Sequence, residues 1–410
     1  MRIGWRSLLP DDDEQAELVG RLWLPSTRGP VLVRVQGDSL HDLSDIAPTC
    51  SDLLNHEDPV RAIRRARPLP LIAALSDLVL DGAEPQATDR PALLAPCDLQ
   101  PVKASGVTFV ASLLERIIEE RARGDAATAE RLRESIVQIV GRDLQNVRPG
   151  TADAERLKDV LIAQGVWSQY LEVGIGPDAE IFTKAPPLAA VGAGAQIGIH
   201  PKSEWNNPEP EVVLAVSCRG TVVGATLGND VNLRDFEGRS ALLLGKAKDN
   251  NASCAIGPFS RLFDEHFGLD DVRRCDITLR VEGPDGFAFA AESSMARISR
   301  DPFELVEQTI GPNHQYPDGV MLFLGTMFAP TVDRFAAGKG FTHVVGDVVT
   351  VSTPRLGTLV NRVNHTDQIA PWTFGIGALM NNLAERGLLP TRYRPAGAGD
   401  LSVSSTPSPD

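Results

Sequence analysis

The chain has 410 residues, of which 42% are hydrophobic and 23% are charged, as in ordinary globular proteins large enough for two domains. Its formal net charge of −14 argues against a nucleic-acid-binding surface, which requires a basic field. No run of about 18 apolar residues is present, and residues 1–13 lack the apolar core of a signal peptide. We therefore expect no nucleic-acid partner, no membrane span and a cytoplasmic location.

Five cysteines are scattered along the chain without a CxxC pair. This usage indicates reduced, mostly buried thiols rather than a disulfide framework or a zinc site. They are Cys50, Cys97, Cys218, Cys254 and Cys275.

The first hundred residues carry no chemical signature, although Val31 to Val35 is typical of a strand. From Ala111 to Glu120 the apolar spacing predicts an amphipathic helix, on which Ser112 and Glu115 share one face. A plain N-terminal capping arrangement is the alternative for that pair. Further helices are expected over 126–144 and 152–164.

From about residue 180 short Val- and Ile-rich strands dominate, with two helices expected at 301–310 and 377–386. The tail at 395–410 is rich in Ser, Pro, Gly and Asp and is expected to be disordered. We therefore divide the chain into an N-terminal accessory domain at 1–178, a catalytic domain at 179–394 and that tail.

Two strands, predicted over 211–218 and 221–227, flank Arg219-Gly220, a candidate for a two-residue hairpin turn. With that turn, Glu211 faces Gly228 and Glu209 faces Asp230. Side chains on one strand face lie close together, so three carboxylates would converge.

Three converging carboxylates repel one another unless a positive charge lies between them. Oxygen ligands of this kind suit a hard divalent cation such as magnesium, calcium or manganese. A solvated acidic sheet edge is the alternative, since a one-residue slip in register would scatter the set.

A longer series of motifs identifies a resemblance. Glu209-x-Glu211, Gly228-Asn-Asp230-Val-x-x-Arg234-Asp, Lys248, Cys254-Ala-Ile-Gly-Pro258, Gly325-Thr326, Gly346-Asp347 and Gly357-Thr-Leu-x-Asn361 follow in order. Together they resemble the fumarylacetoacetate hydrolase family over roughly 180–390. The resemblance implies an α+β fold, in which a mixed β-roll catalytic domain accompanies a smaller α/β N-terminal domain. It also implies magnesium, or manganese, held by Glu209, Glu211 and Asp230, and a homodimer or homotetramer.

Other motifs indicate the branch of the family. Many hydrolytic members carry Gly-x-Asn-Tyr-x-x-His-x-x-Glu. The corresponding stretch here is Gly106-Val-Thr-Phe-x-x-Ser112-x-x-Glu115, in which the Glu is kept and Ser112 stands at the His position. Ser203-x-Trp-Asn-x-Pro-Glu209 and Arg234-x-x-Glu237-Gly resemble the branch that dehydrates 2-keto-3-deoxy-pentonates. The departure at 245–249, where that branch usually has Gln and Tyr, indicates a different pocket rim.

Dehydration of a 2-keto-3-deoxy-pentonate requires a base near C3 and an acid near the C4 oxygen. Lys248 is the candidate for one transfer, with its pKa lowered by metal and burial. Glu115, directly or through a water held by Ser112, is the candidate for the other. Lys246 is the alternative family lysine, although the spacing to Cys254 favours Lys248, and Cys254 itself fits a core residue better than a nucleophile.

The candidates for substrate binding each have a structural alternative. Thr326 is assigned to the substrate carboxylate or to a turn, whereas Ser203 and Arg234 contact hydroxyl groups or brace the metal loop. Lys184 is a further candidate or a structural charge.

We therefore predict a magnesium-dependent hydro-lyase of pentose oxidation that converts a D-xylonate- or L-arabinonate-type substrate to 2,5-dioxopentanoate. The alternative is an acylpyruvate-type hydrolase, with His200 or His314 replacing the missing histidine, or a 2-oxo-acid decarboxylase on the same fold. A non-catalytic member of the family is the third possibility.

Overall fold

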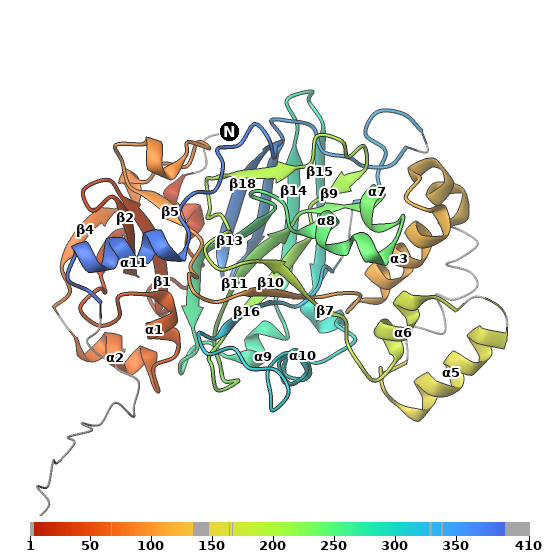
Figure 1. Cartoon of the computed structure of the whole chain (residues 1–410), viewed down its shortest axis with the longest axis horizontal. Helices are drawn as coiled ribbons and strands as arrows, with labels where there is room; N and C mark the ends of the chain where they lie inside the picture. Colours follow the sequence, from red (N-terminus) through yellow and green to blue (C-terminus); the bar gives the residue numbers. More distant parts are fainter. Residues whose placement is uncertain are drawn as a thin grey trace, which may run out of the picture.

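The computed structural model describes residues 4–66, 68–133, 147–163, 165, 167–327, 330–337 and 339–389. Among these residues the chain builds two large sheets, one small sheet and helices at both ends of the molecule (Figure 1). No described helix combines the length and the apolar character that crossing a membrane requires. The predicted tail at 395–410 lies outside the described residues.

Among the described residues, the larger sheet contains eleven strands. Its strands, in spatial order, are β4 (Leu71–Ala74), β3 (Ser39–Asp42), β2 (Gly29–Gln36), β1 (Leu18–Leu24), β13 (Cys254–Leu262), β11 (Val222–Asp230), β10 (Pro210–Val216), β16 (Val320–Phe323), β6 (Val102–Ser105) and β7 (Ile181–Ala185), and β5 (Ala92–Leu94) pairs with β1. β10, β11 and β13 are almost entirely buried, because apolar side chains cover both of their faces.

The second sheet packs over one face of the first. It consists of β15 (Ala288–Ser294), β14 (Asp276–Glu282), β17 (Val348–Thr353), β18 (Gly357–His365) and β8 (Gln196–Ile199). Leu214 and Leu227 from the larger sheet and Leu279 and Val351 from this sheet belong to one buried apolar cluster. This sheet-on-sheet core holds the hairpin of β10 and β11 rigidly. A two-stranded sheet, β9 (Asn206–Asn207) with β12 (Asn232–Leu233), lies beside the hairpin's open end.

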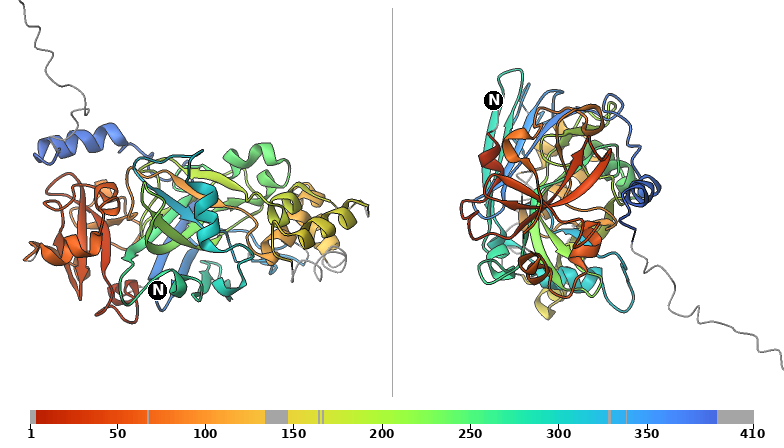
Figure 2. Two further views of the ribbon diagram at one scale, coloured as in Figure 1. Left: turned by 90° about the horizontal axis from the view of Figure 1, so that it is seen from below. Right: turned by 90° about the vertical axis from the view of Figure 1, so that its left-hand side faces the viewer.

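The helices occupy separate parts of the molecule. Apart from the helical residues 126–133, the α-helices among the described residues are α1 (Cys50–Leu54), α2 (Pro59–Arg65), α3 (Val110–Ala122), α5 (Ala152–Ala163), α6 (Gln169–Ile175), α7 (Arg234–Glu237), α8 (Leu244–Lys248), α9 (Leu269–Val272), α10 (Pro302–Thr309) and α11 (Ile376–Glu385). Short 3-10 turns are η1 (Trp5–Leu8), η2 (Leu75–Asp77), η3 (Pro85–Ala87), η4 (Ala241–Leu243) and η5 (Met295–Arg297). Helices α3, α5 and α6 pack together at the end opposite to β1–β4 (Figures 1 and 2).

Most elements expected from the sequence are present. The predicted strand at 31–35 lies within β2, and the helices predicted at 111–120, 152–164, 301–310 and 377–386 correspond to α3, α5, α10 and α11. Residues 126–133 of the predicted helix at 126–144 are helical, and the remainder lies outside the described residues. The mixed sheets with flanking helices confirm the α+β class.

Strands from before and after residue 178 share the larger sheet. β1 pairs with β13, and β6 pairs in parallel with β16. The boundary proposed between residues 178 and 179 is therefore a point in the sequence and does not separate two sheets. The division into two domains stays a prediction.

Candidate active site

The hairpin of β10 and β11 has the predicted register. Glu211 lies opposite Gly228, and the Asp230 N–H donates a hydrogen bond to the Glu209 carbonyl at 3.0 Å. Gly228 is required at this point, because an added Cβ would lie 2.2 Å from the Phe323 ring. The backbone thus brings all three predicted ligand positions to the open end of one hairpin.

The turn of this hairpin is longer than the predicted two-residue turn. The Ser217 N–H donates to the Thr221 carbonyl at 2.8 Å, so three residues form the loop. A register shift after Ala215 compensates for the additional residue. The bulge therefore restores the register that a two-residue turn would have given.

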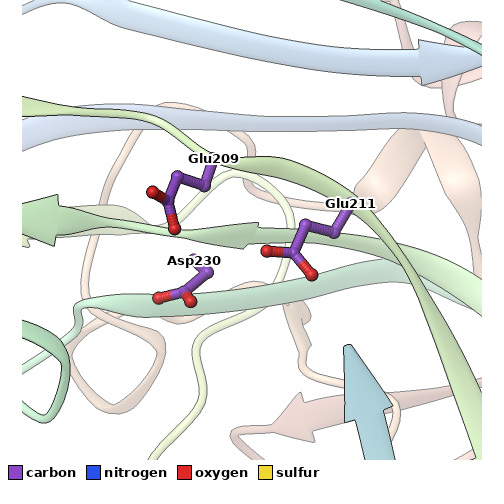
Figure 3. Close-up of side chains that lie close together, drawn as sticks. All are labelled: Glu209, Glu211 and Asp230. Carbon is purple, nitrogen blue, oxygen red and sulfur yellow. The ribbon is translucent and has the colours of Figure 1, made fainter. Parts of the chain in front are cut away.

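Carboxylate oxygens of Glu209, Glu211 and Asp230 all lie within 4.8 Å of one another, and each side chain is buried. Figure 3 shows the three side chains directed toward one small volume, two from β10 and its preceding residue and one from β11. We call this set the carboxylate trio. Its all-oxygen chemistry is the donor set that magnesium or manganese prefers.

Two lysines neutralise part of the trio. Lys248 Nζ lies 2.5 Å from Glu209 Oε2 and 2.9 Å from Asp230 Oδ2. Lys184 Nζ lies 2.7 Å from Asp230 Oδ1 and also donates to the Val231 carbonyl at 3.0 Å. Burial acts to raise the pKa of Asp230, but these two ammonium groups hold that pKa below its ordinary value.

Glu211 is the member of the trio with the least favourable electrostatic surroundings. Its Oε2 accepts a hydrogen bond from the Gly325 N–H at 2.6 Å. Burial, followed by the charges of Asp230 and Glu209, raises the pKa of Glu211 well above its ordinary value. A divalent cation among the three carboxylates would supply the missing positive charge, so the residues present fit the group.

Lys248 is held as an ammonium in this arrangement. Burial acts to lower its pKa, but the carboxylates of Asp230 and Glu209 outweigh that effect and raise it. The pKa of Lys248 is thus shifted in the direction opposite to the lowering expected from burial and a metal. The carboxylates that hold Lys248 were identified from the sequence, but their direct pairing with the lysine was not.

Arg116 on α3 is a residue that sequence reasoning missed. Its guanidinium contacts Glu209 Oε1 directly, lies 2.6 Å from Glu119 Oε2 and 3.1 Å from Glu237 Oε2. Both oxygens of Glu209 are therefore paired, one with Arg116 and the other with Lys248. The spacing of Arg116 and Glu119 on a helix also suits an exposed ion pair, so only the tertiary fold identifies them as site residues.

Glu180 is the second group that sequence reasoning missed. Burial and then the charge of Glu237 raise its pKa from 4.5 to about 7. The carboxylate lies directly over Gly106, where an added Cβ would be 1.8 Å from Glu180 Oε2. The Gly106 N–H also donates to the Glu180 carbonyl at 3.0 Å, which ties the two segments together.

The structure places Ser112 and Glu115 in interactions within and beside α3. Ser112 Oγ donates to the Phe109 carbonyl at 2.9 Å. Glu115 is paired with Arg133, and its second oxygen lies 2.8 Å from Arg234 Nη2. Both carboxylate oxygens of Glu115 are thus occupied by guanidinium groups.

The proposed substrate-binding residues divide into two groups. Arg234 binds Glu119 and Glu115 and lies over the Trp205 ring, while Ser203 Oγ donates to Asp235 Oδ1 at 2.8 Å. These contacts correspond to the structural alternative, in which Arg234 and Ser203 brace the metal loop. Lys184 and Thr326, by contrast, are next to the trio, Lys184 through Asp230 and Thr326 through the adjoining Gly325.

Two further groups bear on the alternative chemistries. Cys254 lies opposite Asp230 in the sheet, and burial raises the pKa of its thiol well above the ordinary value, which disfavours a nucleophile. His343 is buried and its Nδ1 lies 2.9 Å from Asp347 Oδ2. Its backbone N–H donates to Asn206 Oδ1 at 3.1 Å, so this histidine braces the loop before the trio.

Comparison with known proteins supports the resemblance drawn from the motifs. Residues 171–364 match the family model described as fumarylacetoacetate (FAA) hydrolase C-terminal. The chain is 30% identical over 190 residues to a 2-dehydro-3-deoxy-D-arabinonate dehydratase of Saccharolobus solfataricus, covering 46% of this chain and 60% of that protein. It is also 30% identical over 194 residues to a probable 2-keto-3-deoxyxylonate dehydratase of Haloferax volcanii, covering 47% and 63%. The matches thus span less than two thirds of each relative.

Solved structures establish the shared fold. A 2-keto-3-deoxyarabinonate dehydratase aligns with a TM-score of 0.54 at 21% identity, covering 84% of this chain and 98% of the other. A 2-keto-3-deoxy-D-arabinonate dehydratase complexed with magnesium and 2,5-dioxopentanoate aligns with a TM-score of 0.53 at 21% identity, covering 85% and 99%. Residues 171–364 therefore match the family that the motifs resemble, and the chain shares the fold of these solved structures.

Proposed function

We propose that this protein is a magnesium-dependent hydro-lyase that dehydrates a 2-keto-3-deoxy-pentonate to 2,5-dioxopentanoate in oxidative pentose catabolism. The observation that carries the proposal is the buried carboxylate trio with Lys248 paired to two of its members. The names of both curated relatives, and the magnesium and 2,5-dioxopentanoate of one structural neighbour, support the same chemistry.

The trio is the set of residues that would hold magnesium, with manganese as the alternative. Such an ion, when bound, acts as a Lewis acid toward the oxygens of a 2-keto acid. Around it, Gly325 orients Glu211, Arg116 orients Glu209 and Lys184 orients Asp230. These contacts fix the ligand carboxylates before any cation arrives.

Lys248 is our candidate for the proton donor. As an ammonium beside Glu209 and Asp230 it can donate a proton to the departing C4 hydroxyl group. Glu180 is our candidate for the base that removes the C3 proton, because a carboxyl with a pKa of about 7 is ionised in a useful fraction near neutral pH.

Glu115 and Ser112 remain the alternative pair for one proton transfer. Two guanidinium groups hold the Glu115 carboxylate, which makes Glu180 the stronger candidate. Among the proposed substrate contacts, Thr326 beside Gly325 is the candidate for the substrate carboxylate and Lys184 for a charge next to Asp230. Arg234 and Ser203 act by bracing the loop before the trio.

The proposal also covers the ligand, the location and the oligomeric state of the protein. A small 2-keto acid is the expected ligand, in a cytoplasmic homodimer or homotetramer. Neither nucleic acid nor a membrane is an expected partner, because the net charge is −14 and no described helix suits a membrane span.

A direct assay tests this function. The purified protein with magnesium is incubated separately with 2-keto-3-deoxy-D-xylonate, 2-keto-3-deoxy-L-arabinonate and an acylpyruvate, and products are identified by mass spectrometry. We expect loss of one water from a pentonate, abolished by EDTA and by Glu211→Ala. The exposed Glu292→Ala serves as the matched control and should remain active.

The alternatives give different products. Cleavage of the acylpyruvate to pyruvate with both pentonates unchanged would replace the dehydratase by a hydrolase. Release of carbon dioxide from a 2-oxo acid would indicate a decarboxylase. Dehydration that persists after complete metal removal would contradict the role of the trio.

A further inference from the structure

A polar cavity of about 540 Å³ lies between the start of α6 and the segment from α7 to η4. Tyr170 and Glu237 line it and are 5% and 4% exposed, so they form its inner wall. Arg123 and Arg239 also line it and are exposed, which places them at its rim. The volume is in the range of small-molecule pockets.

The inner wall of this cavity is connected to the carboxylate trio. Glu237 Oε2 lies 3.1 Å from Arg116 Nη1, and the same guanidinium contacts Glu209. One arginine therefore separates the cavity from a proposed metal ligand. Since Glu209 and Glu211 are 2% and 1% exposed, a substrate requires such a route to reach them.

Tyr170 is positioned by the helices at this end of the molecule. Its ring belongs to the apolar cluster that includes Leu113 and Ile117 of α3. Ser168 caps α6 and its hydroxyl donates to Glu120 Oε2 at 2.5 Å, which fixes the first turn of the helix against α3. Burial and then the charge of Glu237 raise the pKa of Tyr170, so its phenol keeps its proton and is a hydrogen-bond donor.

We propose that this cavity receives the hydroxylated end of the 2-keto acid and that Tyr170 is the side chain that binds it and sets specificity. The Tyr170 hydroxyl is a donor and the Glu237 carboxylate an acceptor, a pair that matches the hydroxyl groups of a polyhydroxy acid. The guanidinium groups of Arg123 and Arg239 at the rim attract the anionic ligand in a protein of net charge −14. The inference rests on the proposed function for the identity of the substrate.

The cavity is tested first by filling it. Ala241→Trp places a large side chain in it, and Ala83→Trp is the matched control, because Ala83 lines a separate cavity of about 340 Å³ next to Trp23. The KM for the pentonate is measured with the magnesium-loaded protein, and calorimetry measures the binding of pyruvate and the magnesium affinity. We expect a KM for the pentonate at least about 10-fold higher in Ala241→Trp only, with pyruvate binding and magnesium affinity unchanged in both variants.

Tyr170→Phe tests specificity, and Tyr316→Phe, outside the cavity, is its control. Loss of one hydrogen bond predicts a KM for the pentonate about 10-fold higher, while pyruvate, which has no hydroxyl group, binds as before. An unchanged KM, or equal weakening of both ligands, would overturn the role of Tyr170.

These measurements separate the cavity from the reaction. If the wild type binds the pentonate without converting it, the proposed function fails. The dissociation constant of the pentonate then replaces KM in the comparison of variants and still tests the cavity. If Ala241→Trp turns over the pentonate with the KM of the wild type, the cavity proposal fails and the dehydratase stands. Failure of the wild type to bind either ligand overturns both.

Discussion

Arg116 and Glu209 form a buried ion pair although 93 residues separate them in the chain. The contact joins α3 to the residue that precedes β10, the strand that carries Glu211. Because the same guanidinium holds Glu119 and Glu237, one side chain organises three buried carboxylates. The helix at one end of the molecule is therefore part of the candidate active site.

Arg116→Lys should weaken magnesium binding by about 10- to 100-fold, the usual effect of removing an outer partner of a metal ligand. Lysine keeps the charge but cannot reach three carboxylates at once with the planar fork of arginine. Calorimetric titration with magnesium measures the effect. Arg121→Lys on the exposed face of the same helix is the control and should bind like the wild type. An unchanged affinity in Arg116→Lys would contradict the orienting role.

The metal-free protein should become less stable as pH rises above about 4.5, the ordinary pKa of Glu211. The folded state raises that pKa, so between the unfolded and folded values the native protein binds a proton that the unfolded chain does not. Stability therefore falls with rising pH. Urea unfolding in EDTA from pH 5 to 8 measures the slope, which Glu211→Gln should reduce and Glu292→Gln should leave unchanged.

Added magnesium should reverse this loss. A cation that binds only the folded protein stabilises it increasingly as its concentration exceeds the dissociation constant. We expect the largest gain at the highest pH, where Glu211 would otherwise carry an uncompensated charge. A gain of equal size in Glu211→Gln would show that magnesium acts elsewhere.

The carboxylate trio could be predicted because its geometry is local. Two short strands, a turn and the period of two place Glu209, Glu211 and Asp230 together, and a neighbouring bulge restored the register despite a longer loop. The pairing of Lys248 with that set was not predictable from its spacing. It depends on how α8 packs against the hairpin, which no local pattern contains.

The surroundings of the trio could not be predicted for a related reason. Arg116 and Glu119 occur in a helix whose pattern also suits an exposed ion pair, and only packing of α3 against the hairpin buries them. Glu180 precedes β7 by one residue and carries no motif of its own in the sequence analysis. Gly106 belongs to the same motif as Ser112 and Glu115, but only the fold shows that the Glu180 carboxylate lies against it.

Glu180→Gln and Glu115→Gln should have different effects. A base with a pKa of about 7 contributes to proton transfer, so Glu180→Gln should lower kcat by about 10²- to 10⁴-fold and remove the acidic limb of the pH–rate profile. Glu115→Gln weakens pairs with Arg133 and Arg234 and should act mainly on stability. Steady-state rates and urea unfolding distinguish the two. The reverse pattern would assign the base to Glu115.

Gly106→Ala should reproduce the loss seen in Glu180→Gln without altering the chemistry of any carboxyl group. An added Cβ would lie 1.8 Å from Glu180 Oε2, so the carboxylate has to move away from its present position. We expect kcat to fall while magnesium affinity, which depends on the trio, stays within about 3-fold of the wild type, well below the shift expected for an outer partner of a metal ligand. Gly268→Ala is the control, because a Cβ there meets nothing within 4 Å. A fully active Gly106→Ala would show that the position of Glu180 does not matter, and would return the second proton transfer to Glu115.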